Sequence, residues 1–179
     1  MDRSFPQVRR ILDHAQHLIR FYQHSKVGYK DQTNHIIIDA KYEAGSEFVN
    51  GLAIVISDQK RGYINEQGKE IIPLKFEDAA LFSNGLACVK YAGKYGFINN
   101  SGDWVIQPLF ENAFSFVDLY ARVMKNNKWG FINRAGEIVI PCQYDIAFDF
   151  SNGLAAVQLN GKFGYIAHSG QVIIPFQYD

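Results

Sequence analysis

The chain has 179 residues, of which 47% are hydrophobic, and its 18 Lys and Arg residues balance its 18 Asp and Glu residues. Without a net charge it has no long-range field to attract nucleic acid or an anionic membrane, and its apolar runs are too short to span a bilayer. The first residues lack the apolar stretch and cleavage site of a secretory signal, so we expect a cytoplasmic protein that binds neither nucleic acid nor membrane.

The first predicted element is an amphipathic α-helix that reaches from Ser4 to about Ser25. Apolar side chains recur there at steps of three and four residues, which places them on one stripe of a helix. Ser4 and Gln7 form a capping-box pattern at its start. The stripe consists of Val8, Ile11, Leu12, Ala15, Leu18, Ile19 and Tyr22.

After this segment the sequence repeats with a constant step of 34 residues. The segment Lys128-Trp129-Gly130-Phe131-Ile132-Asn133 has close copies at Lys94-Tyr95-Gly96 and at Lys162-Phe163-Gly164. A constant period of this size is typical of arrays in which each unit buries its apolar face by stacking on the next unit. We divide the chain into a capping helix over residues 1–25 and a β-repeat array over residues 26–179, with a partial unit 26–48, units 49–82, 83–116 and 117–150, and a partial last unit 151–179.

Each full unit is predicted to contain three short antiparallel strands. The first alternates constant and variable positions, as in residues 52–57, where Ala53 and Val55 recur in the other units and mark the buried face. A two-residue turn follows, most clearly at Asn160-Gly161, and then the strand that carries the Gly-aromatic-Ile motif. The third strand reaches a proline such as Pro73, which cannot donate to a ladder and therefore indicates a strand end, a bend or a sheet edge.

These recurring residues resemble the WG-repeat family, bacterial arrays of short units named for a Trp-Gly pair. Only Trp129-Gly130 carries the literal pair, because Arg61, Tyr95 and Phe163 stand at the Trp position of the other units. The resemblance implies a β-rich repeat scaffold with no established catalytic activity.

The unit length favours an open, solenoid-like array over a closed ring. A propeller blade usually has four strands in about 40 or more residues, whereas each unit here has 34 residues. The amphipathic helix would then take the place of the first strand that the unit 26–48 lacks. β-Propeller-like closure is the alternative. At the other end, the unit that stops at Asp179 has an uncapped edge, which predicts either weak self-association or a local cap.

We found no motif for catalysis, a cofactor or a metal. A catalytic unit would need residues that the other units lack. Cys88 and Cys142 stand at non-equivalent positions and are interpreted as free thiols. His14 and His17 lie one helical turn apart on the predicted helix, but they share its polar face with arginines and are interpreted as solvated. We therefore expect no enzyme activity.

Two recurring sets of residues are candidate binding positions. The first is the position before each motif glycine. Its residue type changes from unit to unit, which indicates a position near the surface. These side chains either cover the aromatic layer beneath them or form a contiguous row that binds a partner. The second is a lysine ladder, which either pairs with a ladder of acids or forms a docking surface. The candidate residues are Arg61, Tyr95, Trp129, Phe163, Lys60, Lys94, Lys128 and Lys162.

From these features we expect a non-catalytic scaffold for protein-protein interaction, with a protein partner of unknown identity. The alternative is a module that binds a glycan or another small ligand through the repeated aromatic side chains.

Overall fold

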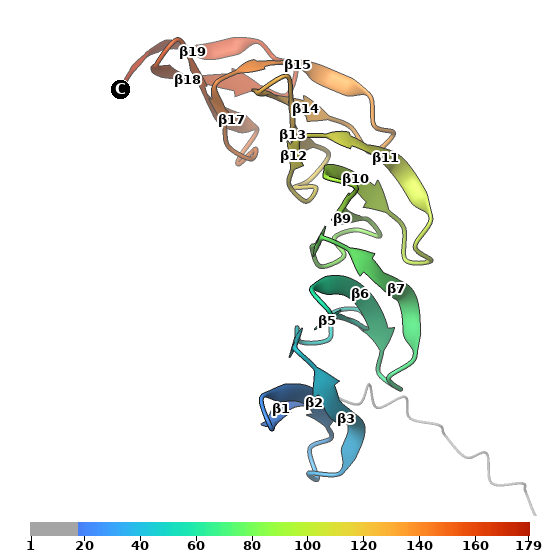
Figure 1. Cartoon of the computed structure of the whole chain (residues 1–179). Coiled ribbons are helices and arrows are strands. Elements are labelled where there is room, and N and C mark those ends of the chain that lie inside the picture. Colours follow the sequence, from blue (N-terminus) through green and yellow to red (C-terminus); the bar gives the residue numbers. More distant parts are fainter. Residues whose placement is uncertain (1–17) are drawn as a thin grey trace, which may run out of the picture.

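The computed structural model describes residues 18–179, which form five antiparallel β-sheets placed one after another (Figure 1). Sheet 1 consists of β1 (Ile19–Gln23), β2 (Lys26–Lys30) and β3 (Ile36–Tyr42). Sheet 2 consists of β4 (Ala44–Gly45), β5 (Leu52–Ser57), β6 (Lys60–Asn65) and β7 (Glu70–Phe76). Sheet 3 consists of β8 (Asp78–Ala79), β9 (Ala87–Tyr91), β10 (Lys94–Ile98) and β11 (Trp104–Phe110).

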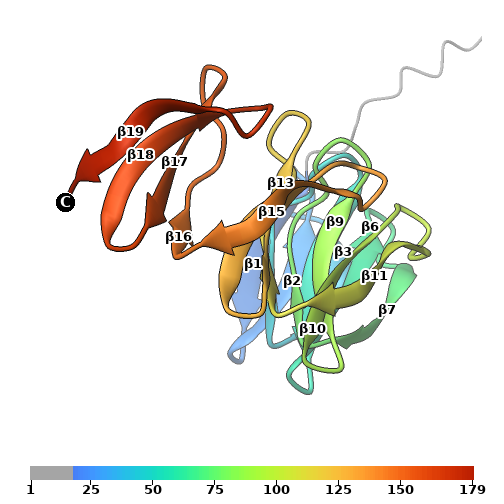
Figure 2. The same cartoon turned by 90° about the horizontal axis from the view of Figure 1, so that it is seen from above.

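Sheet 4 consists of β12 (Asn112–Ala113), β13 (Ala121–Lys125), β14 (Lys128–Ile132) and β15 (Ile138–Tyr144), and sheet 5 of β16 (Ile146–Ala147), β17 (Leu154–Leu159), β18 (Lys162–Ala167) and β19 (Val172–Tyr178). The row of sheets is curved and does not return to its first sheet. The last strand of each sheet lies on the outer side of the curve (Figure 1). Seen from above, sheet 5 points away from the stack of the first sheets (Figure 2). The described residues are thus mainly β, they contain no helix, and none of their sheets closes into a barrel.

The start of sheet 1 shows that the helix prediction was wrong over the residues that the structure describes. Residues 19–23 form β1, which pairs antiparallel with β2. Residues 18–23 stand one 34-residue step before residues 52–57, and the turn after them has the same left-handed backbone, with φ of 48° at His24 and 49° at Asp58. Stacking as the first strand of a unit therefore overrides the helical spacing. Residues 4–17 of the predicted helix lie outside the described residues.

The sheets are connected by short strands that sequence analysis did not predict. Each of sheets 2–5 begins with a two-residue strand. A single residue separates it from the last strand of the preceding sheet, as Glu43 separates β3 from β4. The short strand pairs with the next hairpin, for example Ala44 with Ile56. The last strand of every sheet is a sheet edge, which agrees with the expectation drawn from Pro73. All five of these strands show register shifts in their pairing, including β3, which has no proline.

The core lies between consecutive sheets. Phe131 and Ile140 of sheet 4 form one buried cluster with Val157 and Ile166 of sheet 5. Ala53 and Val55, which we predicted to be buried, are fully inaccessible. Sheets 2–4 therefore each pack against two neighbouring sheets, and in the described residues sheets 1 and 5 each pack against one, as expected for a stacked array.

The constant glycine of the repeat permits a close approach of two strands. A Cβ atom on Gly130 would lie 2.5 Å from the carbonyl oxygen of Ile140 and 2.7 Å from the backbone nitrogen of Cys142. The strands meet there at an irregularity in the β14–β15 pairing. Any side chain larger than hydrogen would force the third strand outward.

Candidate functional site

Trp129, on β14, is 9% exposed and belongs to the core cluster between sheets 4 and 5. The centroid of its ring lies 5.7 Å from that of Phe114, which follows β12. The guanidinium carbon of Arg122 lies 3.6 Å from the Phe114 centroid and 5.7 Å from the Trp129 centroid. Phe114 and Arg122 therefore cover Trp129, the tryptophan of the Trp-Gly pair.

The same arrangement recurs one repeat later. Phe163, on β18, is half-buried, and its ring centroid lies 6.3 Å from that of Phe148. Phe114 and Phe148 are 40% and 50% exposed and stand 34 residues apart. We call the set Tyr95, Phe114, Trp129, Phe148 and Phe163 the aromatic edge. Its exposed surface includes two rings that sequence analysis did not select.

Arg61 and Tyr95 meet at a shared acid. The Tyr95 hydroxyl donates a hydrogen bond to Oδ2 of Asp78 at 3.2 Å, and Nε of Arg61 lies 3.5 Å from Oδ1 of the same carboxylate. Nη1 of Arg61 donates to the carbonyl of Glu77. The structure thus brings together two predicted candidates through Asp78, which was not predicted.

The lysine ladder pairs with the acid ladder in three units. Lys94 lies 4.0 Å from Glu111, and closer ion pairs join Lys128 to Asp145 and Lys162 to Asp179. No carboxylate partner of Lys60 is found in the described part of the chain. Each of these pairs lies within one repeat unit and joins the start of its motif strand to the acid that follows its last long strand.

The acids also bind the hairpin turn of the following sheet. The carboxylate of Glu111 accepts hydrogen bonds from the backbone N–H groups of Asn127 at 2.8 Å and Asn126 at 3.1 Å. The bond from Asn127 is the main reason that the pKa of Glu111 is lowered. The pKa of Asp145 is also lowered, first by its hydrogen bond from Lys128. Each acid that makes these contacts holds the turn of the next unit in place.

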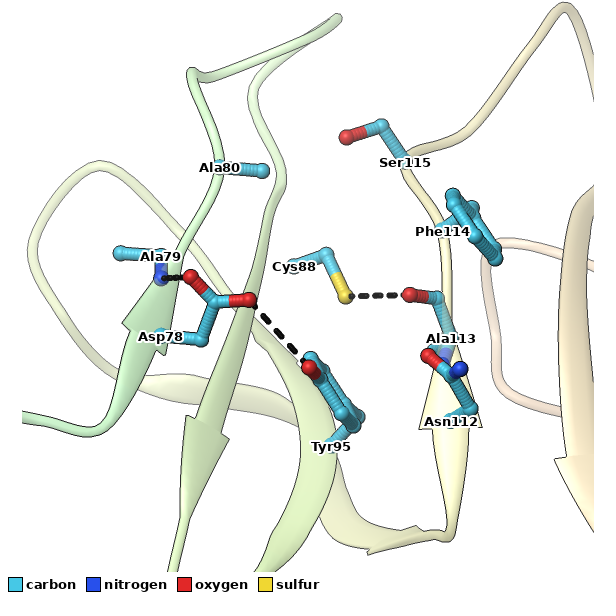
Figure 3. Close-up of a pocket in the computed structure, with 9 residues that line it drawn as sticks. All are labelled: Asp78, Ala79, Ala80, Cys88, Tyr95, Asn112, Ala113, Phe114 and Ser115. Atoms are coloured by element: carbon cyan, nitrogen blue, oxygen red, sulfur yellow. Dashed lines mark hydrogen bonds between the residues drawn. The ribbon is translucent and has the colours of Figure 1, made fainter.

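A pocket of about 340 Å³ lies between sheet 3 and the segment of sheet 4 around β12 (Figure 3). On the sheet 3 side are the Asp78 carboxylate, the Tyr95 hydroxyl and the Cys88 thiol, and on the other side are Phe114 and Ser115 (Figure 3). The remaining lining residues are Ala79, Ala80, Asn112 and Ala113.

The pocket combines one charged group with several neutral polar ones. Burial, followed by the charge of Asp78, raises the pKa of the Cys88 thiol to about 12, so the thiol is protonated at neutral pH. Burial and the neighbouring Asp78 likewise raise the pKa of Tyr95. Asp78 is the one acid among the lining residues, which include no Lys or Arg, although Arg61 outside the lining lies 3.5 Å from its Oδ1.

Two further observations apply to residues 18–179. No group of three or more His, Cys, Asp or Glu side chains in this range is arranged to hold a metal ion. The same range contains no helix of the length and apolarity needed to cross a membrane. Cys88 and Cys142 are free thiols, as predicted.

The profile of the family described as WG containing repeat matches residues 28–60, 62–95, 95–129, 129–163 and 163–179. The chain belongs to the WG-containing repeat family. Its WG repeats keep the glycine because of the close approach at the third strand. The residue before the glycine varies together with the residue 15 positions earlier, which is Ser46, Ala80, Phe114 or Phe148 in the successive units, and in the last two units the two side chains pack on each other.

Two solved structures resemble these WG repeats. One is PorZ of Porphyromonas gingivalis, an essential bacterial surface component of the type-IX secretion system; it is 10% identical, with a TM-score of 0.47 over 91% of this chain and 25% of that one. The other is a protein of unknown function from Bacteroides caccae, 16% identical, with a TM-score of 0.37 over 89% of this chain and 77% of that one. The chain spans about a quarter of PorZ, and neither likeness is close enough to support a structural argument. No curated protein matches the sequence.

The sequence contained a signal for the residues that were missed. Position 46 and its equivalents read Ser46, Ala80, Phe114 and Phe148, so aromatic side chains are added in the two later units only. We selected positions that are aromatic or variable next to the glycine and did not compare this second position between units. Comparing position 46 with its equivalents becomes informative once the structure shows that the two-residue strand places this position beside the Trp position.

Proposed function

We propose that this WG-repeat protein is a non-catalytic scaffold that binds a partner protein along the aromatic edge. The observation that carries the proposal is the exposure of Phe114 and Phe148, at 40% and 50%, at equivalent positions of adjacent units. Each ring lies on a more deeply buried aromatic ring of its own sheet. Together they form a repeated apolar surface on a rigid frame.

The chemistry of this edge is that of a protein interface. Aromatic and arginine side chains are enriched at the centres of interfaces and contribute most of the binding energy there. Arg122 is already held over Phe114 by its ion pair, because its Nε lies 2.8 Å from Asp149 Oδ1. Side chains fixed in this way lose little further rotamer entropy when a partner binds.

The experiment compares capture by the wild-type chain and by the double variant Phe114→Ser, Phe148→Ser. Leu109→Ser is the matched control, because Leu109 is 65% exposed but lies on β11, on the outer side of the row. The wild type and the control should capture the same protein, and the purified protein should bind the double variant about tenfold or more weakly, as expected for loss of interface anchors.

Because Phe114 covers Trp129 and lies under Arg122, the double variant is expected to melt at a lower temperature, and binding is therefore compared at a temperature at which both proteins are fully folded. Equal binding by wild type and double variant would contradict the proposal. A carbohydrate array tests the alternative function, since specific glycan binding that is lost in the double variant would replace a protein partner with a glycan.

A further inference from the structure

The repeats provide four equivalent junctions between consecutive sheets, and their side chains are of three kinds: two arginine-acid pairs, one apolar pair and one pair of small side chains. Each junction places a residue of a first strand near a residue that follows the next short strand, 27 positions later. In chain order the pairs are Arg20 with Glu47, Ile54 with Leu81, Cys88 with Ser115, and Arg122 with Asp149. The first and last junctions hold an ion pair, and the third holds two small side chains.

The two arginine junctions pair a guanidinium with a carbonyl and an acid, although Nε of Arg122 lies 2.8 Å from Asp149 Oδ1 without the alignment of a hydrogen bond. Nη1 of Arg20 donates to the carbonyl of Gly45 at 2.7 Å, and its Nε donates to Glu47 at 2.5 Å. Nη1 of Arg122 donates to the carbonyl of Ala147, also at 2.7 Å. The fold therefore builds, at this position, a carbonyl and an acid that together fit a guanidinium fork.

At the third junction the arginine is missing and the space remains. Cys88 reaches the equivalent carbonyl, that of Ala113, only through a weak thiol donor at 3.6 Å. Ala80 also replaces the phenylalanine that lies beneath Arg122 in the next unit. The three smaller side chains leave the pocket of about 340 Å³.

We propose that this pocket binds a guanidinium group, supplied by an arginine side chain of the protein partner. The identity of the donor as a partner side chain rests on the proposed function; the binding of the group itself does not. The Ala113 carbonyl and the Ser115 hydroxyl stand where the Ala147 carbonyl and Asp149 stand around Arg122. The Asp78 carboxylate supplies the negative charge.

A guanidinium fits these acceptors better than an ammonium group does. Its planar fork donates in two directions at once, as Arg20 and Arg122 do, and its flat face can stack on an aromatic ring. Oδ1 of Asp78 accepts a hydrogen bond from the backbone N–H of Ala79 at 3.0 Å and lies 3.5 Å from Nε of Arg61. Oδ2 accepts from the neutral Tyr95 hydroxyl, and a carboxylate oxygen can accept a second hydrogen bond, so Oδ2 is the atom that a bound guanidinium would use.

The test is an NMR titration of the full chain with N-acetyl-L-arginine amide, with the citrulline and lysine analogues as controls. Saturable shifts are expected at the amides of Cys88 and of residues 112–115. Citrulline should bind about tenfold more weakly, because charge-assisted hydrogen bonds are roughly twice as strong as neutral ones. No saturable binding, or equal binding of citrulline, would overturn the proposal.

Three variants make the test specific. Cys88→Arg combined with Ser115→Asp rebuilds the pair seen at Arg122 and should abolish binding, whereas Ala156→Arg, which adds an arginine at the equivalent position of sheet 5, should leave it unchanged. Ser115→Asp alone adds the missing acid and should tighten arginine binding about tenfold.

Retained binding in the filled double variant, or no gain in Ser115→Asp, would contradict the proposal. Unchanged partner capture by the Phe114 and Phe148 variant, with arginine binding to the wild-type chain intact, would refute the proposed function and leave the pocket standing. Lost capture by that variant without saturable arginine binding to the wild-type chain would refute the pocket alone.

Discussion

Replacing Gly130 with alanine tests why the repeat keeps a glycine at this position. The added Cβ would lie 2.5 Å from the Ile140 carbonyl oxygen and 2.7 Å from the Cys142 nitrogen, whereas carbon and carbonyl oxygen normally approach to about 3.3–3.6 Å. The third strand must therefore move by about 1 Å, and the atoms in its way are backbone. Overpacking costs about 1–3 kcal/mol, and since neither neighbour can rotate away we expect about 3 kcal/mol.

The assay is urea unfolding at 25 °C followed by tryptophan fluorescence, with Gly153→Ala as the matched control. A Cβ on Gly153 would meet no atom within 4 Å, although its φ is +82°, so its cost is that of the left-handed backbone alone, about 1–2 kcal/mol. The reasoning would be refuted if Gly130→Ala cost no more than Gly153→Ala.

Three further predictions concern the turns and the thiols. The lowered pKa values of Glu111 and Asp145 mean that these acids stabilise the fold when they are ionised. The free energy of unfolding should therefore fall as the pH drops below about 4. A Glu111→Gln, Asp145→Asn variant should show a smaller fall, and an identical pH profile would contradict this. Asn127 has a φ of 56° in a two-residue hairpin turn, so Asn127→Gly should raise the free energy of unfolding by about 0.5 kcal/mol, and a loss of stability would show that its side chain matters more than its backbone. Cys88 is 4% exposed with a raised pKa, so a thiol reagent at pH 8 should modify it more slowly than Cys142 in the folded protein and at the same rate in urea; faster modification of Cys88 would contradict its burial.

The 34-residue period was sufficient to predict the hairpins, the buried Ala53 and Val55, and the stacking of units. It was insufficient at residues 18–23, where apolar residues satisfy both helical spacing and equivalence with residues 52–57. The equivalence with residues 52–57 was the correct guide, because a strand at residues 19–23 completes sheet 1 by pairing with β2. The two-residue strands are too short to show any period.

The candidate site was only partly predictable for a related reason. Variation at position 129 and its equivalents indicated a surface, but Trp129 is covered by Phe114 and Arg122 from segments that pack beside it. The pocket depends on Cys88 and Ser115, whose pairing across 27 residues is visible only when the sheets are stacked. Composition and spacing within one unit do not contain that information.

The central claim is that a partner binds on the aromatic edge, and hydrogen–deuterium exchange with the captured partner tests it most directly. The account predicts slower exchange at residues 111–116 and 145–150, around Phe114 and Phe148, and unchanged exchange in β7 and β11. Protection confined to β7 and β11 would place the partner on the outer strands and contradict the claim.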